Sequence, residues 1–135
     1  MTVELVDWGR LVAKAIEARN NAYAPYSGFS VGAALWTQDG EVVTGCNVEN
    51  VSFPCGQCAE ANAAGAMVSA NRHSTIHAVA IAAVSRHFVW PCGRCRQILA
   101  EFADGDTPVM AVAGDQRSAP LSLVELLPHA FATLG

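Results

Sequence analysis

Two short cysteine-containing segments limit most strongly what this chain can fold into. The first is Cys58-Ala59-Glu60 and the second is Pro91-Cys92-Gly93-Arg94-Cys95. Each segment lies where the sequence predicts the start of a helix. Helical positions three apart share one face, so both thiols of the second segment point to the same side. The fold must therefore bring two helix starts together if the three thiols are to meet.

Three thiolates at two helix N-termini are suited to zinc. A helix N-terminus offers partial positive charge and free N–H groups, which favour the thiolate form of cysteine. Zinc with three protein ligands keeps a vacant fourth position, which distinguishes catalytic from structural sites. Zinc lowers the pKa of a bound water to about 7. Glu60 follows the ligand Cys58 by two residues, close enough to take that proton without binding the metal. The pattern predicts zinc on Cys58, Cys92 and Cys95, with Glu60 as the general acid and base.

A closed structural zinc site is the main alternative, because Cys55 and Cys58 form a second pair of the same spacing. Two such pairs bind zinc through four thiolates in zinc ribbons. However, 33 residues separate Cys58 from Cys92, whereas ribbons usually have about 15–20. A closed site also has no use for Glu60. The catalytic site is favoured, while a structural zinc protein or interaction module, or a set of buried free cysteines, remains open.

The order of predicted elements indicates one three-layer α/β domain with a mixed sheet, residues 1–135. Apolar residues recur at helical spacing near the N-terminus, and Asp39-Gly40 is typical of a tight hairpin turn. An apolar run after residue 75 is typical of a strand buried on both faces. The sequence predicts helices at about 3–22, 58–70, 93–102 and 121–131, the last interrupted at Pro128, and strands at 30–36, 41–46, 76–84 and 108–113.

Charge and composition restrict the partners. Charged residues make up 15% of the chain, against about 25% in typical domains, so we expect other subunits to cover part of the surface. A net charge of −4 without a basic cluster argues against binding a long nucleic acid. We expect no membrane span. Met1–Arg10 lacks the features of a secretory signal, so we expect a cytoplasmic location, where the five cysteines stay reduced.

The cysteine motifs resemble those of the zinc deaminases, in which Cys or His precedes x-Glu and a Pro-Cys-x-x-Cys segment follows. The chain is similar to the small cytidine deaminases that act on free nucleosides, and the similarity runs from about residue 10 to residue 131. It implies a three-layer α/β/α cytidine-deaminase-like domain with a mixed five-stranded sheet. The further segments that follow the family pattern are Asn21–Ser27, Phe29, Val31–Ala34, Thr44–Asn50, Cys95–Gln97, Leu126–Pro128 and Ala130-Phe131.

This resemblance implies zinc-dependent hydrolytic deamination of cytidine and 2′-deoxycytidine to uridine and 2′-deoxyuridine. It also implies one zinc per chain and a homotetramer with shared active sites. Asn47 and Glu49 match family residues that bind the sugar hydroxyls, and Phe29 matches an aromatic residue that lies beside the base. The Ala59 backbone matches a contact to the pyrimidine edge, and Phe131 matches an aromatic residue that enters a neighbouring subunit's pocket. The complete set of implied substrate contacts is Phe29, Asn47, Val48, Glu49, Asn50, Phe53, Ala59 and Phe131.

Simpler roles for three of these residues also fit the sequence. Asn47 could instead satisfy backbone groups in a turn. Phe29 could belong to the core, and Phe131 could pack only within its own chain.

The sequence departs from the family where many members have Arg after Cys-Ala-Glu. Ala61 and Asn62 follow Glu60 here. Three thiolates with zinc and hydroxide carry a net charge of about −2, which calls for compensation in a buried site. Arg94 is one candidate for this role, with the alternatives that it faces solvent and that helix dipoles suffice.

Trp90 and Pro54-Cys55 are unusual neighbours of the motif and border the expected pocket, and Arg94 resembles the corresponding residue of the blasticidin S deaminases. A modified cytosine nucleoside such as blasticidin S or an N4-substituted cytidine is therefore the alternative substrate. The segment Asn47–Asn50 favours ordinary nucleosides instead. A deaminase that edits polynucleotides would need a basic channel for the strand, which the negative net charge disfavours.

Overall fold

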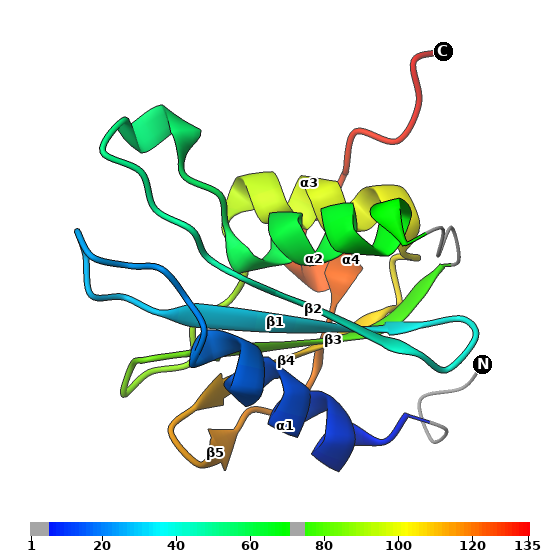
Figure 1. Ribbon diagram of the computed structural model, residues 1–135. Coiled ribbons are helices and arrows are strands. Elements are labelled where there is room, and N and C mark those ends of the chain that lie inside the picture. The colour runs from blue at the N-terminus through cyan, green and yellow to red at the C-terminus, as the bar shows by residue number, and fades with distance from the viewer. Residues whose placement is uncertain (1–5, 71–74) are drawn as a thin grey trace.

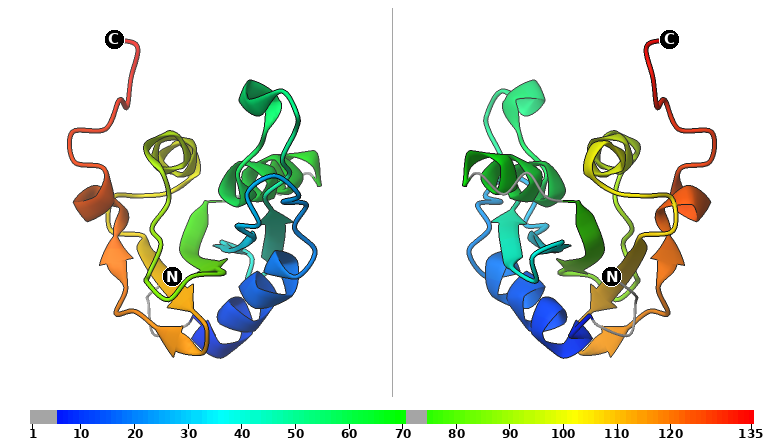
Figure 2. Two further views of the ribbon diagram at one scale, coloured as in Figure 1. Left: turned by 90° about the vertical axis from the view of Figure 1, so that its left-hand side faces the viewer. Right: turned by 90° about the vertical axis from the view of Figure 1, so that its right-hand side faces the viewer.

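The computed structural model describes residues 6–70 and 75–135, which form a mixed sheet between two helical layers (Figure 1). The strand order is β2 (Val42–Cys46), β1 (Val31–Thr37), β3 (Ile76–Ala83), β4 (Pro108–Ala113) and β5 (Gln116–Arg117), with the short β6 (Leu121–Ser122) paired separately to β4. One face of the sheet is covered by α1 (Trp8–Arg19), and the other by α2 (Ala59–Ser69), α3 (Gly93–Phe102) and α4 (Leu123–Leu126) (Figures 1 and 2). The predicted three-layer α/β/α architecture is therefore confirmed.

The sheet is mixed because its strands are linked in two ways. β1 and β2 form the predicted antiparallel hairpin, in which Gly32 lies opposite Cys46. Gly40 in the connecting turn has a φ of +79°, which glycine adopts without steric cost. β1 also pairs antiparallel with β3, whereas β3 and β4 are parallel and are connected through α3. A parallel pair requires a crossover connection. This crossover places the start of α3 at the same end of the sheet as the start of β1.

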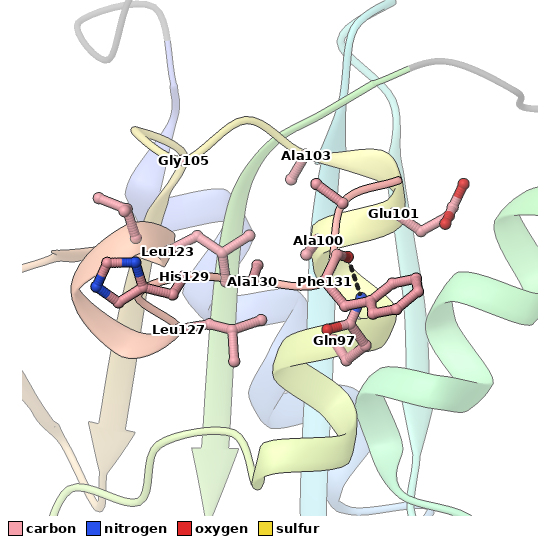
Figure 3. A pocket seen from close by; sticks show the side chains of 12 residues that line it. Gln97, Ala100, Glu101, Ala103, Gly105, Leu123, Leu127, His129, Ala130 and Phe131 are labelled. Atoms are coloured by element: carbon pink, nitrogen blue, oxygen red, sulfur yellow. Dashed lines mark hydrogen bonds between the residues drawn. The ribbon is translucent and has the colours of Figure 1, made fainter. Parts of the chain in front are cut away.

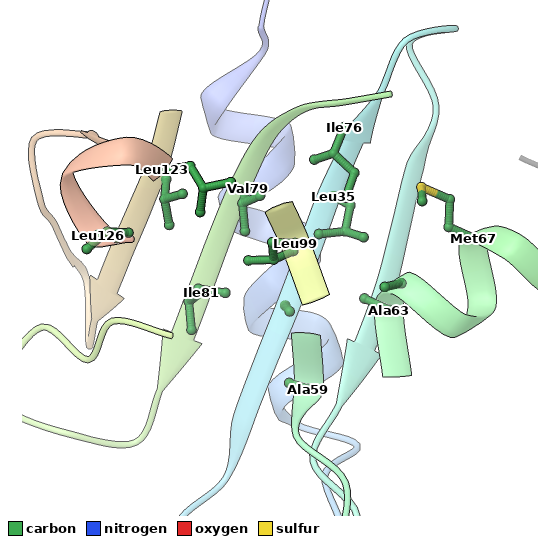
Figure 4. Close-up of a cluster of buried hydrophobic side chains, with 13 residues drawn as sticks. Leu35, Ala59, Ala63, Met67, Ile76, Val79, Ile81, Leu99, Leu123 and Leu126 are labelled. Carbon is green, nitrogen blue, oxygen red and sulfur yellow. The ribbon is translucent and has the colours of Figure 1, made fainter. Parts of the chain in front are cut away.

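Alternating side chains of β1 supply two separate cores, one on each face of the sheet. Ala33 and Leu35 pack toward α2 and α3, while Ala34 and Trp36 pack toward α1. Figure 4 shows the first core, where side chains from the sheet meet Met67 of α2 and Leu99 of α3. β3 contributes to both cores, as its continuous apolar run predicts. This packing fixes α2 and α3 side by side on one face of the sheet.

The predicted helix at 121–131 is wrong, because α4 has only four residues, Leu123–Leu126. Ser122 begins this helix with a capping box: its side chain accepts from the Glu125 N–H, and the Glu125 carboxylate accepts from Ser122. Residues before proline avoid the helical region, and Leu127 before Pro128 has φ −138° and ψ 72°. Two residues of the predicted helix instead form β6 against β4.

The first helix is shorter than predicted at both ends. Asp7 caps α1 by accepting a hydrogen bond from the Arg10 N–H over 3.0 Å, so the helix begins at Trp8. Residues 3–5 of the predicted helix lie outside the described residues. Within 6–70 and 75–135, no helix has the length and apolar character needed to cross a bilayer.

Candidate functional site

The sulfur atoms of Cys58, Cys92 and Cys95 all lie within 4.8 Å of one another. Cys58 is the N-cap of α2, Cys92 is the N-cap of α3, and Cys95 lies in the first turn of α3. The crossover between β3 and β4 brings these helix starts together, as the motif spacing requires. Cys55 is exposed, lies in a separate turn at Phe53–Cys55, and is not a member of this cluster. The described residues therefore present a three-sulfur site and not a four-sulfur site.

The chemistry of these donors fits zinc, which binds thiolates in tetrahedral sites. Burial raises the pKa of the Cys58 thiol, and burial together with the nearby Glu60 carboxylate raises that of Cys95. Burial also opposes ionisation of Cys92, yet hydrogen bonds from the Cys95 N–H and from the other thiols outweigh it and lower the Cys92 pKa. Three adjacent thiolates repel one another, so a divalent cation is the partner that allows all three to ionise.

Glu60 lies in the first turn of α2, and its side chain is only 4% exposed. Burial raises the pKa of this carboxyl above its usual value, although its own backbone N–H and the Cys95 thiol donate to it and oppose the shift. A carboxyl with a raised pKa beside a metal site is suited to accepting and returning a proton near neutral pH. The structure thus places Glu60 where the sequence predicts an acid–base group.

Asn47 follows directly after β2 and connects two neighbouring segments. Its Nδ2 donates to the Phe29 carbonyl over 2.8 Å, and its Oδ1 accepts from the Val31 N–H over 2.8 Å. These bonds correspond to the simpler role expected for Asn47, that of satisfying backbone groups. An amide has two N–H donors, so this side chain can also serve a second partner. Phe29 is 38% exposed, so the simpler expectation that it belongs to the core is wrong.

Glu49 is held by the loop that precedes β1. Its Oε1 accepts from the backbone N–H groups of Tyr26 over 2.9 Å and Ser27 over 3.1 Å, and its Oε2 accepts from the Ser27 hydroxyl. The Ser27 hydroxyl is the largest cause of the lowered pKa of Glu49, and the two backbone donors act in the same direction. The carboxylate is therefore fixed in position and stays ionised at neutral pH.

A cavity of about 320 Å³ lies beside this carboxylate and is lined by Tyr26, Ser27, Glu49, Asn50, Phe53 and Gly56. The Tyr26 and Phe53 rings meet edge to face, with centroids 6.4 Å apart. Sequence reasoning identified three of these residues, Glu49, Asn50 and Phe53, but missed Tyr26 and Ser27. The signal that could have found them is the short polar loop Tyr26-Ser27-Gly28, which ends at a glycine with φ +69°.

The segment that carries Glu49 is joined to the segment that carries Cys58. Val48 and Gln57 exchange two backbone hydrogen bonds of 3.0 and 2.9 Å in an isolated antiparallel bridge. Ala59, directly after Cys58, is buried in the core as the first residue of α2. The candidate sugar-binding residues and the metal ligands are therefore parts of one connected structure.

Phe131 lies on the C-terminal segment beyond α4 and is 67% exposed. Gln97 of α3 donates to the Phe131 carbonyl over 2.9 Å, which docks this segment on α3 (Figure 3). The Phe131 side chain lines a second cavity of about 360 Å³ together with Ala100 and Leu127. Within one chain, Phe131 is therefore not among the residues lining the cavity beside Glu49.

The two arginines near the second motif have different surroundings. Arg94 is exposed, and its Nη2 lies 3.4 Å from the Oε1 of Gln57, the residue before Cys58. Arg96 donates to the Pro91 carbonyl and to the Leu126 carbonyl, each over 2.6 Å. Arg96 thereby ties the loop before Cys92 to the end of α4. Sequence reasoning did not assign this role, since the two acceptors are backbone groups distant along the chain.

Comparison with known proteins gives consistent matches over most of the chain. Residues 7–111, which include the three cysteines and Glu60, match the family described as the cytidine and deoxycytidylate deaminase zinc-binding region. A cytidine deaminase of Halalkalibacterium halodurans is 43% identical over 128 residues, covering 93% of this chain and 95% of that protein. A cytidine deaminase of Mycobacterium tuberculosis is 44% identical over 130 residues, covering 93% and 90%.

Two solved structures share the fold closely. The crystal structure of cytidine deaminase from Mycobacterium tuberculosis has a TM-score of 0.84 at 41% identity, covering 95% of this chain and 99% of that one. The structure from Burkholderia pseudomallei has a TM-score of 0.84 at 37% identity, covering 97% and 100%. The α/β/α sheet and helices described above thus have direct counterparts in experimental structures.

Proposed function

The chain belongs to the cytidine deaminase family, and on that basis we propose that it hydrolyses cytidine and 2′-deoxycytidine to uridine and 2′-deoxyuridine with release of ammonia. The observation that supports this most directly is the cluster of three sulfurs, from Cys58, Cys92 and Cys95, beside the buried carboxyl of Glu60. This arrangement provides both a metal site and an acid–base group, which are the two requirements for hydrolytic removal of an amine from a pyrimidine.

The mechanism assigns the proton transfers to Glu60. Cys58, Cys92 and Cys95 would hold one zinc ion per chain, and that ion would supply Lewis acidity to the water that attacks the ring carbon bearing the amine. Glu60 accepts one proton of that water and delivers it to the adjacent ring nitrogen. It then carries the water's second proton from the oxygen now bonded to the ring carbon to the amine, whose C–N bond breaks to release ammonia. Burial of the carboxyl keeps it away from bulk water, and its raised pKa allows it to hold a proton between these transfers.

The sugar is assigned to Asn47 and Glu49, whose segment is joined to that of Cys58 through the Val48–Gln57 bridge. Glu49 is ionised and fixed by the Ser27 and Tyr26 donors, so it can accept a hydrogen bond from a ribose hydroxyl without reorganising. Asn47 has a second N–H for the same hydroxyls. The remaining proposed contacts are the Phe29 ring beside the base, the Ala59 backbone at the pyrimidine edge, and Val48, Asn50 and Phe53 around the sugar.

Arg94 is proposed to offset part of the negative charge of the thiolates. It lies between two ligands in sequence, and its guanidinium approaches Gln57, the neighbour of the third ligand. The positive charge of Arg94 therefore lies where the segment of Cys92 and Cys95 contacts the segment of Cys58. Because Arg94 is exposed, solvent and salt screen its effect.

The working unit is proposed to be a cytoplasmic homotetramer of single-domain chains, residues 1–135, in which Phe131 reaches a neighbouring subunit's site. Phe53 is 78% exposed and packs against the exposed Tyr26 ring, and Phe131 is 67% exposed. Large exposed apolar patches usually mark interaction surfaces. The clustering of Cys58, Cys92 and Cys95 fits metal binding rather than disulfide pairing, which supports a reducing compartment. A fully active monomer in light scattering at micromolar concentration would contradict this assembly.

The activity is tested by ultraviolet monitoring of the purified protein with a panel of cytosine nucleosides. We expect the highest kcat/KM with cytidine and 2′-deoxycytidine, and lower values with N4-substituted cytidine and blasticidin S. Turnover confined to a modified nucleoside would replace the proposed substrate but keep the reaction class. Zinc-loaded protein that deaminates none of them would overturn the proposal.

A further inference from the structure

Helix α2 lies directly on strand β2 near the active site. A Cβ atom at Gly45 would stand 2.4 Å from the Ala63 nitrogen and 2.5 Å from the Ala59 carbonyl oxygen. Such distances are shorter than real side-chain contacts allow, so the helix backbone rests on the strand at this glycine. The contact involves the helix turn that follows Cys58 and includes Glu60. The distance between the metal-binding turn and β2 is therefore set by backbone packing.

Asn62 adds a directional bond at the same place. Its Nδ2 donates to the Cys46 carbonyl, the last residue of β2, over 2.8 Å, and the side chain is partly buried. The Asn62 backbone N–H also donates to the Cys58 carbonyl over 3.1 Å. One residue thus connects the helix start that carries a metal ligand with the strand end that leads into Asn47.

The strand end is itself rigidly held, so a bond to it has a defined direction. Asn47 bonds to both Phe29 and Val31, and Gly32 pairs with Cys46 across the hairpin. A movement of α2 along β2 would consequently shift Glu60 relative to the Asn47 side chain. Packing at Gly45 limits how near the helix can come, but it does not stop the helix from sliding.

We propose that Asn62 is a positioning residue that sets the register between the metal-binding half of the site and the sugar-binding half. The inference rests on the proposed deaminase function and on the sugar contacts of Asn47 and Glu49. A nucleoside bound through its hydroxyls presents its base at a fixed distance. Misplacement of reacting groups by about 1 Å can cost about 100-fold in rate. Asn62 therefore lets the binding of the sugar contribute to alignment of the base with Glu60.

The choice of asparagine is consistent with this role. Asparagine is a weaker helix former than alanine, and Asn62 lies inside a helix that is otherwise rich in alanine. Replacement by alanine favours the helix while removing the bond to Cys46. Asn62→Asp keeps the size of the side chain but removes the N–H donor, and a carboxylate is tolerated near a helix N-terminus. Two variants therefore remove the same bond by different means.

The experiment measures whether replacement of Asn62 lowers kcat/KM more for a nucleoside that carries the ribose hydroxyls than for one that lacks them. We would determine kcat/KM of the parent, Asn62→Ala and Asn62→Asp for cytidine and for 2′,3′-dideoxycytidine. The second nucleoside lacks the 2′- and 3′-hydroxyls but keeps the 5′-hydroxyl. Ser69→Ala, at the exposed far end of α2, serves as the control. Calorimetric Kd values for uridine and 2′,3′-dideoxyuridine provide a readout independent of turnover. Zinc content and thermal unfolding are recorded for each protein.

We expect both Asn62 variants to lose about 10- to 100-fold with cytidine and no more than about threefold with the dideoxynucleoside. The preference for uridine over dideoxyuridine should shrink in parallel, and Ser69→Ala should match the parent. Equal losses on both substrates, no loss on either, or zinc loss in both variants would overturn the inference. Parent protein that does not distinguish the two nucleosides would also overturn it. A parent inactive on both would instead reject the proposed function.

Discussion

Gly45 of β2 and Ala59 of α2 lie so close that a Cβ atom at position 45 would stand 2.5 Å from the Ala59 carbonyl oxygen. Gly45 is paired with Ala33 in the hairpin and Ala59 is buried in the core, so neither backbone can withdraw without shifting β2 or α2. We predict that Gly45→Ala lowers the free energy of unfolding by about 1–3 kcal/mol. Chemical denaturation of the zinc-loaded protein measures the change.

Gly65 is the matched control, because it lies in the same helix and a Cβ atom there would meet no neighbouring segment within 4 Å. Gly65→Ala should raise the free energy of unfolding by about 0.5–1 kcal/mol through better helix propensity. Similar stabilities of the two variants would show that α2 is not pressed against β2.

Removing the carboxylate of Glu60 should abolish most deamination while the fold and the zinc are kept. Glu60→Gln retains the size of the side chain but cannot carry a proton between water and amine. The expected loss in kcat is about 10²- to 10⁴-fold. Steady-state rates and zinc content are compared with Glu101→Gln, whose site is exposed on α3. Near-normal turnover of Glu60→Gln would remove Glu60 from the mechanism.

Cys55 should be dispensable for zinc. It is exposed in the Phe53–Cys55 turn, outside the three-sulfur cluster. Cys55→Ser should retain about one zinc per chain by elemental analysis, whereas Cys95→Ser should lose most of it. If Cys55→Ser loses its zinc as well, a four-thiolate structural site is the better description.

Arg94 should contribute modestly to zinc retention. Its guanidinium stands near Gln57, between the two ligand segments, and is exposed. Arg94→Gln should therefore weaken zinc binding by up to about fivefold at low salt, which corresponds to an exposed ion pair, and by less at high salt. Competition with a chelator measures the affinity. An unchanged affinity at low salt would assign the compensation of charge to the helix N-termini alone.

Binding at the sugar end should be insensitive to mild acid. Hydrogen bonds led by the Ser27 hydroxyl hold the pKa of the Glu49 carboxyl below its usual value. A group with a lowered pKa keeps its interactions above the unfolded pKa and loses them only as the pH falls through the folded pKa. The ratio of the uridine Kd of Glu49→Gln to that of the parent should thus stay constant from about pH 8 to about pH 5, because any titration of Glu60 affects both proteins alike. A several-fold weakening in the parent alone across this range, at constant zinc content, would contradict the prediction.

Elements with strong local signals could be predicted from the sequence to the residue. The predicted helix at 93–102 is α3, and the predicted strand at 108–113 is β4. Pro108 and Gly114 delimit β4, and Gly114 has a φ of +61°, which ends the extended run. The convergence of three cysteines also followed from spacing, because two helix starts on one sheet face can meet in few ways.

The elements that were missed depend on contacts between distant residues. β5 and β6 have only two residues each, and each is a strand because its backbone pairs with β4. Asn62 bonds to Cys46 and Arg96 bonds to Leu126, so neither role leaves a local pattern in the sequence. Such residues resemble ordinary helix surface until the partner carbonyl is known.

The helix starts at Cys58 and Cys92 have one more consequence. Cys58 makes no side-chain capping hydrogen bond, and Cys92 accepts one from the Cys95 N–H only through sulfur, a weaker acceptor than the oxygen of the good caps that contribute about 0.5–2 kcal/mol. Because both N-cap residues belong to the proposed zinc site, loss of a bound ion would remove an interaction from both helix starts and loosen them at once. In a zinc-starved cell, proteases would remove the loosened chains, so the amount of protein, and not only its turnover, would follow the metal supply.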